Sequence, residues 1–372
     1  MWSWSFFTDS LKLAGSKTQG LALATVVVLI NVLLAVLIMW QFIRLLAFIH
    51  RRMGLKVLLV LGVPVMALAE YAVAWLVALI WLGPQGSIDN VLPMGSVGLP
   101  VVTTPFRFAA RIVVLYGLGG FGWLIVYLVT RKPTRKARLW PIGALAVLSF
   151  VGFFTYRTTN GVSLRAELIS ERLSARVPVV TPENVDLVVF PEYGLDKITN
   201  ENLATRIVGL GDKPAYFVGS EQVFRNRTTG HLNRMLFGNT RDGMLEAQDK
   251  YRLIPGGEDL PYVVRSGLRA LGQQSTISYF DYARSVLKGE SQLLPFVIGD
   301  DIRVASAVCS SIIAPQDYRD FARSGANLFT NSASLATFKG SPLFSWQQKT
   351  LGKFMAVSNA RYFLQSANAA SA

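Results

Sequence analysis

The chain has 372 residues, a formal net charge of +14, a hydrophobic content of 51% and a mean hydropathy of +0.37. Soluble globular proteins of this length rarely have so apolar a composition, so we expect part of the chain to be embedded in a membrane. The single cysteine excludes an intramolecular disulfide, and the only two histidines, His50 and His231, exclude most metal sites built from several histidines. We therefore expect no bound metal or cofactor.

The positive charge could indicate nucleic-acid binding, but many of the basic residues flank long apolar runs. The sequence contains no helix-turn-helix signature, zinc finger or aromatic RNA-binding motif. Basic residues beside apolar runs set membrane topology and attract anionic lipids. We therefore expect a membrane contact and no direct binding of nucleic acid.

Residues 1–156 carry the long apolar runs and are predicted to form an α-helical membrane domain. Residues 2–17 mix tryptophan and phenylalanine with lysine, which is typical of a segment at the membrane interface. About four transmembrane helices are expected, at 20–49, 57–82, 108–130 and 140–155, of which the last is the shortest.

Two basic segments, 50–56 and 131–138, separate these spans, whereas the loop 83–106 has almost no positive charge. The positive-inside rule places both basic segments in the cytoplasm. With four spans the chain after residue 156 then faces the periplasm or the cell exterior, and with three spans it would face the cytoplasm.

Glu70 lies inside the second predicted span. An ionisable residue at such a position is costly and often functional. The alternative is a carboxyl group that is protonated or hydrogen-bonded between helices, and the sequence leaves both interpretations open.

Residues 157–372 have the alternation of a soluble α/β domain. Strands are predicted at 185–190, 215–220, 296–298, 302–308 and 327–331, and a hairpin is predicted between 231–237 and 244–247. Helices are predicted at 162–177, 200–209, 315–324 and 345–361, and 260–290 is expected to be an extended excursion. This mixture of helices and strands predicts an α/β sandwich.

Three reactive side chains follow predicted strands. Cys309 ends the apolar run 304–308, Glu192 follows 185–190, and Lys250 follows the predicted hairpin. A cysteine nucleophile must lose its proton, and a nearby carboxylate can accept it. A lysine can lower the pKa of the thiol and stabilise a developing oxyanion. His231 alternates with apolar residues in the hairpin, so a surface or packing role is expected for it.

These motifs resemble those of the nitrilase, or carbon–nitrogen hydrolase, superfamily. The resemblance rests on Phe190-Pro191-Glu192, on Lys250 with the run 253–258, and on Val308-Cys309, and it covers roughly residues 180–369. It implies an α-β-β-α sandwich with Glu192 as general base, Lys250 as oxyanion stabiliser and Cys309 as nucleophile. It also implies that Glu258 is a supporting carboxylate.

A membrane domain before such a domain resembles the apolipoprotein N-acyltransferase branch, and the size and domain order resemble the short plasmid conjugal-transfer protein TraB. The resemblance implies a multi-pass protein of the bacterial inner membrane with a periplasmic catalytic domain. It further implies a phospholipid or other acyl donor, a protein or peptide amine as acceptor, and the conjugation machinery as a further partner.

Three interpretations remain open. The first is a membrane-anchored, Cys-dependent acyltransferase or amidase, and the second is a conjugation component that applies the same chemistry to a plasmid-specific substrate. The third is a non-catalytic scaffold. The intact set of Glu192, Lys250 and Cys309 favours an enzyme, whereas Ser311, where the acyltransferase branch usually has a glutamate, favours the scaffold.

Overall fold

The structure is a computed structural model of the chain. It describes residues 17–83, 95–131, 134–155, 163–170, 179–181, 185–195, 199–202, 207–209, 215–224, 230–253, 258–283, 286–289, 294–298, 301–335 and 341–368. The predicted interfacial segment lies outside these residues except for its last position, and residues 84–94 of the predicted loop 83–106 also lie outside them.

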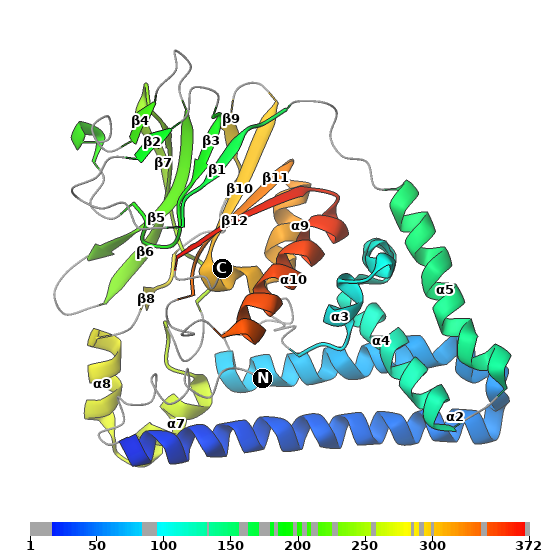
Figure 1. Cartoon of the computed structure of the whole chain (residues 1–372). Helices are drawn as coiled ribbons and strands as arrows, with labels where there is room; N and C mark the ends of the chain where they lie inside the picture. The colour runs from blue at the N-terminus through cyan, green and yellow to red at the C-terminus, as the bar shows by residue number, and fades with distance from the viewer. Residues whose placement is uncertain are drawn as a thin grey trace.

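The first described helix, α2 (Lys17–Leu82), is a helical hairpin rather than one rod. The backbone is non-helical at Gly54, where φ is 83°, a conformation that glycine adopts without steric cost. Trp81 Nε1 donates a hydrogen bond to Asn31 Oδ1 over 3.3 Å. A continuous helix would separate these two residues by about 75 Å, so the chain must double back, and Figure 1 shows the two arms of α2 side by side. The arms correspond to the first two predicted spans.

The rest of the helical half consists of α3 (Gly98–Val102), the 3₁₀ helix η3 (Pro105–Ala109), α4 (Ala110–Arg131) and α5 (Arg135–Phe154). In the part of the chain that is described, three helical segments are long and apolar enough to cross a membrane, namely Val28–Leu82, Pro105–Arg131 and Arg135–Phe154. A Cβ atom at Gly120 would lie 2.4 Å from the backbone oxygen of Val63. Glycine therefore lets α4 approach α2 closely.

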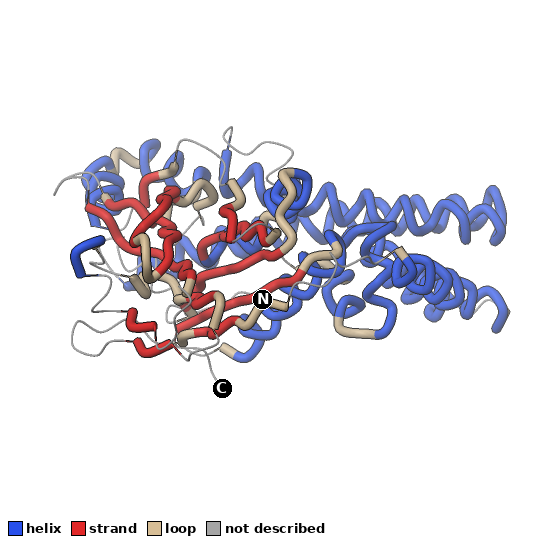
Figure 2. Tube along the Cα trace, turned by 90° about the horizontal axis from the view of Figure 1, so that it is seen from above, coloured by secondary structure: helices blue, strands red, loops and turns tan. Residues whose placement is uncertain are grey.

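Both predicted basic segments border the same end of the helices. His50 Nδ1 lies 3.4 Å from Tyr127 Oη, and the Arg131 guanidinium lies 5.8 Å from the centre of the Tyr127 ring. The turn of α2 and the end of α4 are thus neighbours. At the opposite end of α2, Trp81 packs in one apolar cluster with Leu335 of the α/β half. Figure 2 shows the long helices extending away from the strands to one side.

The α/β half contains two main sheets. The first has the order β1 (Ala166–Leu168), β3 (Leu187–Val189), β5 (Tyr216–Phe224), β6 (His231–Asn239) and β7 (Gly243–Asp249), with β8 (Val286–Leu287) beside β6. The second has the order β12 (Tyr362–Asn368), β11 (Leu328–Ser334), β10 (Ile302–Val308) and β9 (Phe296–Ile298). A separate pair joins β2 (Val179–Thr181) to β4 (Ile207–Gly209). The strands β1, β3 and β5 run parallel, as do β10, β11 and β12.

The two main sheets pack face to face around a shared apolar core. Val189 and Phe237 of the first sheet contact the cluster that contains Phe296 and Val304 of the second. The rings of Phe237 and Phe296 are stacked, with centroids 4.5 Å apart. Two layers of β-structure therefore form the centre of this half, as the sandwich prediction requires.

Helices cover the other face of the second sheet. Phe329 of β11 packs with Phe321 of α9 (Pro315–Arg323) and Phe354 of α10 (Pro342–Asn359), and the same cluster includes Leu118 of α4. Helices α9 and α10 thus lie between the second sheet and the helical half (Figure 1). On the outer face of the first sheet, the described packing partners include Ile207 of β4 and Met244 of β7. The short helical stretch 200–202 borders this face, where Asn200 Oδ1 accepts a 2.8 Å hydrogen bond from the backbone N–H of Met244.

Several predicted elements are confirmed, and others are wrong. The strands at the core, the β6–β7 hairpin, α9 and α10 match their predictions. The helix predicted at 162–177 is wrong where it is described, because 166–168 is the strand β1. The helix predicted at 200–209 is confirmed at 200–202 and wrong at 207–209, which is the strand β4. Both segments are strands because each pairs with another strand, β1 with β3 and β4 with β2. The excursion 260–290 contains two helices, α7 (Tyr262–Ala270) and α8 (Gln274–Ala283).

Candidate active site

Glu192 lies three residues beyond β3 and is held at the junction of the two sheets. Its backbone N–H donates to the oxygen of Ala333 over 3.2 Å, and its own backbone oxygen accepts from Asn368 Nδ2 over 3.1 Å. Next to it, Tyr193 has a φ of 56° and donates its backbone N–H to Ser220 Oγ over 2.9 Å. The chain therefore turns sharply behind the carboxyl group, whose residue is only 5% exposed.

An amide on the neighbouring strand β6 orients this carboxyl group. Asn233 is fully buried, and its Nδ2 donates to Glu192 Oε1 over 2.7 Å. The Asn233 backbone oxygen also accepts a 2.8 Å hydrogen bond from the backbone N–H of Lys250. A single residue of β6 thus positions both Glu192 and the start of the segment that carries Lys250.

Lys250 is fully buried immediately after β7, with its ammonium between two carboxylates. Its Nζ lies 3.8 Å from Glu192 Oε1 and makes a closer ion pair with Glu258. The other oxygen of Glu258 accepts a hydrogen bond from Ser310 Oγ over 3.4 Å. Burial of a charged lysine requires such partners, because an uncompensated charge in the interior is very costly.

Cys309 follows β10 directly and begins the short 3₁₀ helix η4 (Cys309–Ile313). Its φ is 44°, which is unfavourable for a residue with a side chain and turns the chain sharply at the thiol. The thiol donates to the backbone oxygen of Ser334 over 3.8 Å. Asn331 Nδ2 donates to the backbone oxygens of Ala307 and Cys309 over 3.2 and 3.3 Å, which fixes this turn.

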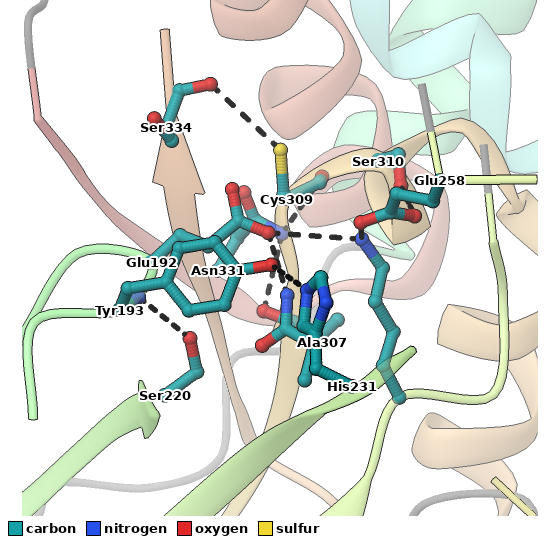
Figure 3. A network of polar contacts seen from close by, with 12 residues as sticks. Glu192, Tyr193, Ser220, His231, Glu258, Ala307, Cys309, Ser310, Asn331 and Ser334 are labelled. Atoms are coloured by element: carbon teal, nitrogen blue, oxygen red, sulfur yellow. Dashed lines mark hydrogen bonds and ion pairs between the residues drawn. The ribbon is translucent and has the colours of Figure 1, made fainter. Parts of the chain in front are cut away.

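The structure thus brings together all four residues singled out from the sequence: Glu192, Lys250, Glu258 and Cys309. Figure 3 shows the side chains of Glu192, Glu258 and Cys309 converging from separate elements. They meet because β3 runs parallel to β5 in the first sheet and β10 runs parallel to β11 in the second, so the carboxyl ends of these strands lie at one edge of the sandwich.

Burial and the neighbouring charges shift the pKa values of the three reactive side chains. Burial raises the pKa of the Glu192 carboxyl, although the Lys250 ammonium opposes this and hydrogen bonds from Cys309 and Asn233 lower it somewhat. Burial alone would lower the pKa of Lys250, but the carboxylates of Glu258 and Glu192 outweigh burial and raise it. Burial and the negative charge of Glu192 raise the pKa of the Cys309 thiol well above its ordinary value.

The site therefore combines a thiol, an ammonium group and a carboxyl group that each have a raised pKa. A carboxylate of this kind suits a general base that takes a proton as the thiol attacks, and a preorganised ammonium suits stabilisation of an oxyanion. Among the residues that the structure describes, no cluster of histidine, cysteine and acidic side chains is suited to holding a metal ion.

Sequence reasoning assigned no orienting role to several residues around this centre. Asn233, Ser310 and Asn331 orient the reactive groups, and His231, assigned to the surface or to packing, is half-buried with its Nε2 3.3 Å from Tyr193 Oη. Burial lowers the pKa of His231. The available signal was position, since Asn233 stands two residues after His231, on the same face of β6, and Ser310 directly follows the candidate nucleophile.

No protein-family model and no curated protein matches the chain. Among solved structures, it is similar to a cysteine-to-alanine mutant of the Nesterenkonia AN1 amidase from the nitrilase superfamily, with 13% identity and a TM-score of 0.31. A crystal structure of an amidase from Nesterenkonia sp. matches with 13% identity and a TM-score of 0.30. Each match covers 50% of this chain and 63% of the amidase chain.

Proposed function

We propose that the chain is a membrane-anchored, nitrilase-like enzyme that transfers acyl groups through Cys309. The observation that carries this proposal is the convergence of Cys309, Glu192 and Lys250, with the Lys250 ammonium 3.8 Å from the Glu192 carboxylate. A thiol, a base and a fixed cation are the groups that acyl transfer through a thioester requires.

In the first half-reaction Cys309 attacks the carbonyl carbon of an ester or amide while Glu192 takes the thiol proton. The carbonyl oxygen becomes an oxyanion, which the Lys250 ammonium stabilises. Collapse of this intermediate breaks the bond to the leaving group, and Glu192 returns the proton to the departing alcohol or amine. The product is a thioester on Cys309.

In the second half-reaction an amine or a water molecule attacks the thioester carbonyl, and Glu192 accepts its proton. The new bond forms as the Cys309 sulfur leaves, and the sulfur regains the proton from Glu192. An amine acceptor makes the protein an acyltransferase, and water makes it an amidase or esterase.

The position of the helical half favours a lipid acyl donor. Leu335 directly follows Ser334, whose backbone oxygen accepts the hydrogen bond from the Cys309 thiol. Leu335 also belongs to the apolar cluster that contains Trp81, at the end of α2. Apolar side chains therefore connect a helix that is long and apolar enough to cross a membrane to the residue next to the candidate nucleophile.

We further propose that the helices anchor the protein in a bacterial inner membrane with the α/β half in the periplasm. The common location of the two basic segments at one end of the helices, with the α/β half at the other, supports this topology under the positive-inside rule. A phosphatase reporter fused after residue 372 should be active in the periplasm. A cytoplasmic reporter that fluoresces from the same fusion point would reverse the topology.

The biological setting that we propose is plasmid conjugal transfer, and apolipoprotein N-acylation is the second candidate. In the first setting the Cys309→Ala variant should lower the frequency of plasmid transfer without changing lipoprotein maturation. In the second, diacylated lipoprotein should accumulate instead. A transfer frequency and a lipoprotein pattern equal to those of the wild type would exclude both settings.

The chemistry is tested with the purified full chain in detergent. Incubation with an activated fatty-acyl ester should give a covalent acyl adduct that hydroxylamine removes, because thioesters are cleaved readily by hydroxylamine. Cys309 is the only cysteine, so a thioester can form nowhere else. Cys309→Ala should give no adduct, and Cys309→Ser should give at most an ester that resists mild hydroxylamine.

Thermal unfolding of each variant provides the matched control, since a lost adduct is informative only if the variant is folded. Equal labelling of the wild type and Cys309→Ala would refute the nucleophile assignment. A folded wild-type protein that forms no thioester with any ester or amide donor would favour the non-catalytic scaffold.

A further inference from the structure

The helical half contains a cavity of about 200 Å³ that the acyl-transfer chemistry does not use. It is enclosed by both arms of α2, by the segment 95–97 and by α4. Its lining is mostly apolar, and the residues that matter for recognition are Met39, Glu70, Val77, Tyr116 and Trp123. Among its described lining residues, Glu70 is the only acidic one, and it is 8% exposed.

Three donors hold the Glu70 carboxyl group at the wall of this cavity. Oε1 accepts from the backbone N–H of Val97 over 3.1 Å and from Trp123 Nε1 over 2.9 Å. Oε2 accepts from Ser96 Oγ over 2.6 Å. A carboxylate oxygen has room for about two hydrogen bonds. The contacts found among the described residues therefore fill Oε1 and leave one acceptor position on Oε2.

The backbone of α4 is shaped around the same oxygen. A Cβ atom at Gly119 would lie 2.1 Å from Glu70 Oε2, so only a glycine leaves room for the carboxyl group in this position. The Glu70 carboxyl group is thus contacted on two sides. Donors from the segment 95–97 and from Trp123 lie on one side, and the backbone of Gly119 lies on the other.

The cavity has the chemistry that recognises an ammonium group. It offers a carboxylate oxygen with a free acceptor position and two aromatic side chains, Tyr116 and Trp123, while none of its described lining residues is basic. Ammonium ions bind to carboxylates and to the faces of aromatic rings, and both attractions strengthen away from water. We propose that this cavity binds the primary ammonium of an ethanolamine-type phospholipid, with the apolar lining against its chains.

The length of α2 indicates in which leaflet of the bilayer Glu70 lies. Glu70 lies 14 residues beyond Lys56, which corresponds to about 21 Å along a helix. The hydrocarbon core of a bilayer is about 30 Å thick. With the basic end of α2 at one surface, Glu70 therefore lies in the opposite leaflet, below the headgroups on the side of the α/β half.

A structural clamp is the competing explanation, because Glu70 ties the segment 95–97 to α2 and α4. A clamp accounts for the three hydrogen bonds but not for the adjoining cavity, its two aromatic residues or the open position on Oε2. The proposal rests on the membrane placement proposed above and is independent of the chemistry of Cys309.

The test uses the full chain purified from membranes that contain equal amounts of phosphatidylethanolamine and phosphatidylglycerol, with the lipid that stays bound after delipidation measured by mass spectrometry. The wild type should retain the ethanolamine lipid about tenfold over the glycerol lipid, a ratio equivalent to ~1.4 kcal/mol. Glu70→Gln should abolish this preference. Its amide oxygen can still accept from Val97 and Trp123, and Ser96 can accept from its NH₂ group, so the fold should be kept.

Two further comparisons separate binding from structure. Tyr116→Phe should keep the lipid preference and Tyr116→Leu should reduce it, because only the aromatic ring is required. Gly143→Ala is the matched control in α5, since a Cβ atom there meets nothing within 4 Å, and it should behave as the wild type.

Equal retention of the two lipids by the wild type, or an unchanged preference in folded Glu70→Gln and Tyr116→Leu, would refute the site and leave the clamp. Should Glu70→Gln fail to fold, the two Tyr116 variants decide the question, because both keep Glu70. If carbonate extraction released the protein from membranes, the membrane placement itself would be wrong. The thioester assay on Cys309 is read separately from both results.

Discussion

Replacing Lys250 with methionine removes the buried cation and leaves the carboxylates of Glu192 and Glu258 facing each other. Lys250 is fully buried, and the side chains of Glu192 and Glu258 are 6% and 12% exposed. At 3.8 Å, an ion pair with an effective dielectric constant of about 20 is worth about 4 kcal/mol. Loss of one partner of a buried pair typically costs about 3–5 kcal/mol. We expect Lys250→Met to lower the free energy of unfolding by about 4 kcal/mol near neutral pH.

The cost should depend on pH in a defined direction. Because the pKa of Glu192 is raised, this carboxyl takes up a proton at a pH above the ordinary glutamate value of about 4.3. The penalty of Lys250→Met should therefore shrink as the pH falls through that raised value. At the alkaline end, the raised pKa of Lys250 means that its stabilisation of the wild type is complete below the ordinary lysine pKa and is lost only above the raised one.

A double-mutant cycle tests the electrostatic origin of this penalty. Removing one of the two carboxylates as well, in Lys250→Met with Glu258→Gln, should cost less than the sum of the single variants by about 1–3 kcal/mol. The assay is denaturant unfolding of the full chain in detergent at several pH values, followed by tryptophan fluorescence. A single-variant cost below about 1 kcal/mol at neutral pH, or strict additivity in the cycle, would refute the charge argument.

The remaining predictions concern Glu192, its partner Asn233 and the ion pair between Arg252 and Asp317. Glu192→Gln should slow acylation of Cys309 sharply. The same variant should let iodoacetamide alkylate the Cys309 thiol at lower pH, because the negative charge that raises the thiol pKa is gone. A pH profile of alkylation that is unchanged or moves to higher pH would contradict this. Asn233→Ala should slow acylation by about tenfold through loss of the 2.7 Å hydrogen bond to Glu192, measured as the rate of thioester formation; an unchanged rate would remove Asn233 from the site. Arg252→Leu should lower the free energy of unfolding by about 3 kcal/mol, since it strands the buried carboxylate of Asp317, and a variant as stable as the wild type would refute this.

The reactive residues could be predicted from the sequence because each stands at the end of a recognisable strand. Leu187 to Phe190 is a continuous apolar run, and Val304 to Val308 consists of small and β-branched residues with one serine. Such composition is typical of strands that are buried on both faces. The side chain that follows such a run lies at the sheet edge whatever the details of packing. Glu192 and Cys309 could therefore be placed without knowledge of the strand order.

The orienting residues could not be predicted in this way, because their roles depend on strand register. Asn233 contacts Glu192 across 41 residues of sequence, and Asn368 reaches the Glu192 backbone across 176. A shift of one residue in either pairing would turn these side chains to the other face of the sheet. The strand β1 was mistaken for a helix for a similar reason, since a run of three residues has no period of its own and is defined by its pairing with β3.

The backbone at Cys309 shows why the site is more than its reactive residues. A φ of 44° costs a non-glycine residue about 1–2 kcal/mol, and no feature of the sequence around Cys309 announces it. Asn331 offsets this cost by donating to the carbonyls on both sides of Val308. The same turn lets Ser310 reach Glu258, the partner of Lys250. The strained turn thus couples the position of the thiol to the position of the cation, which is the geometry that attack on a carbonyl group requires.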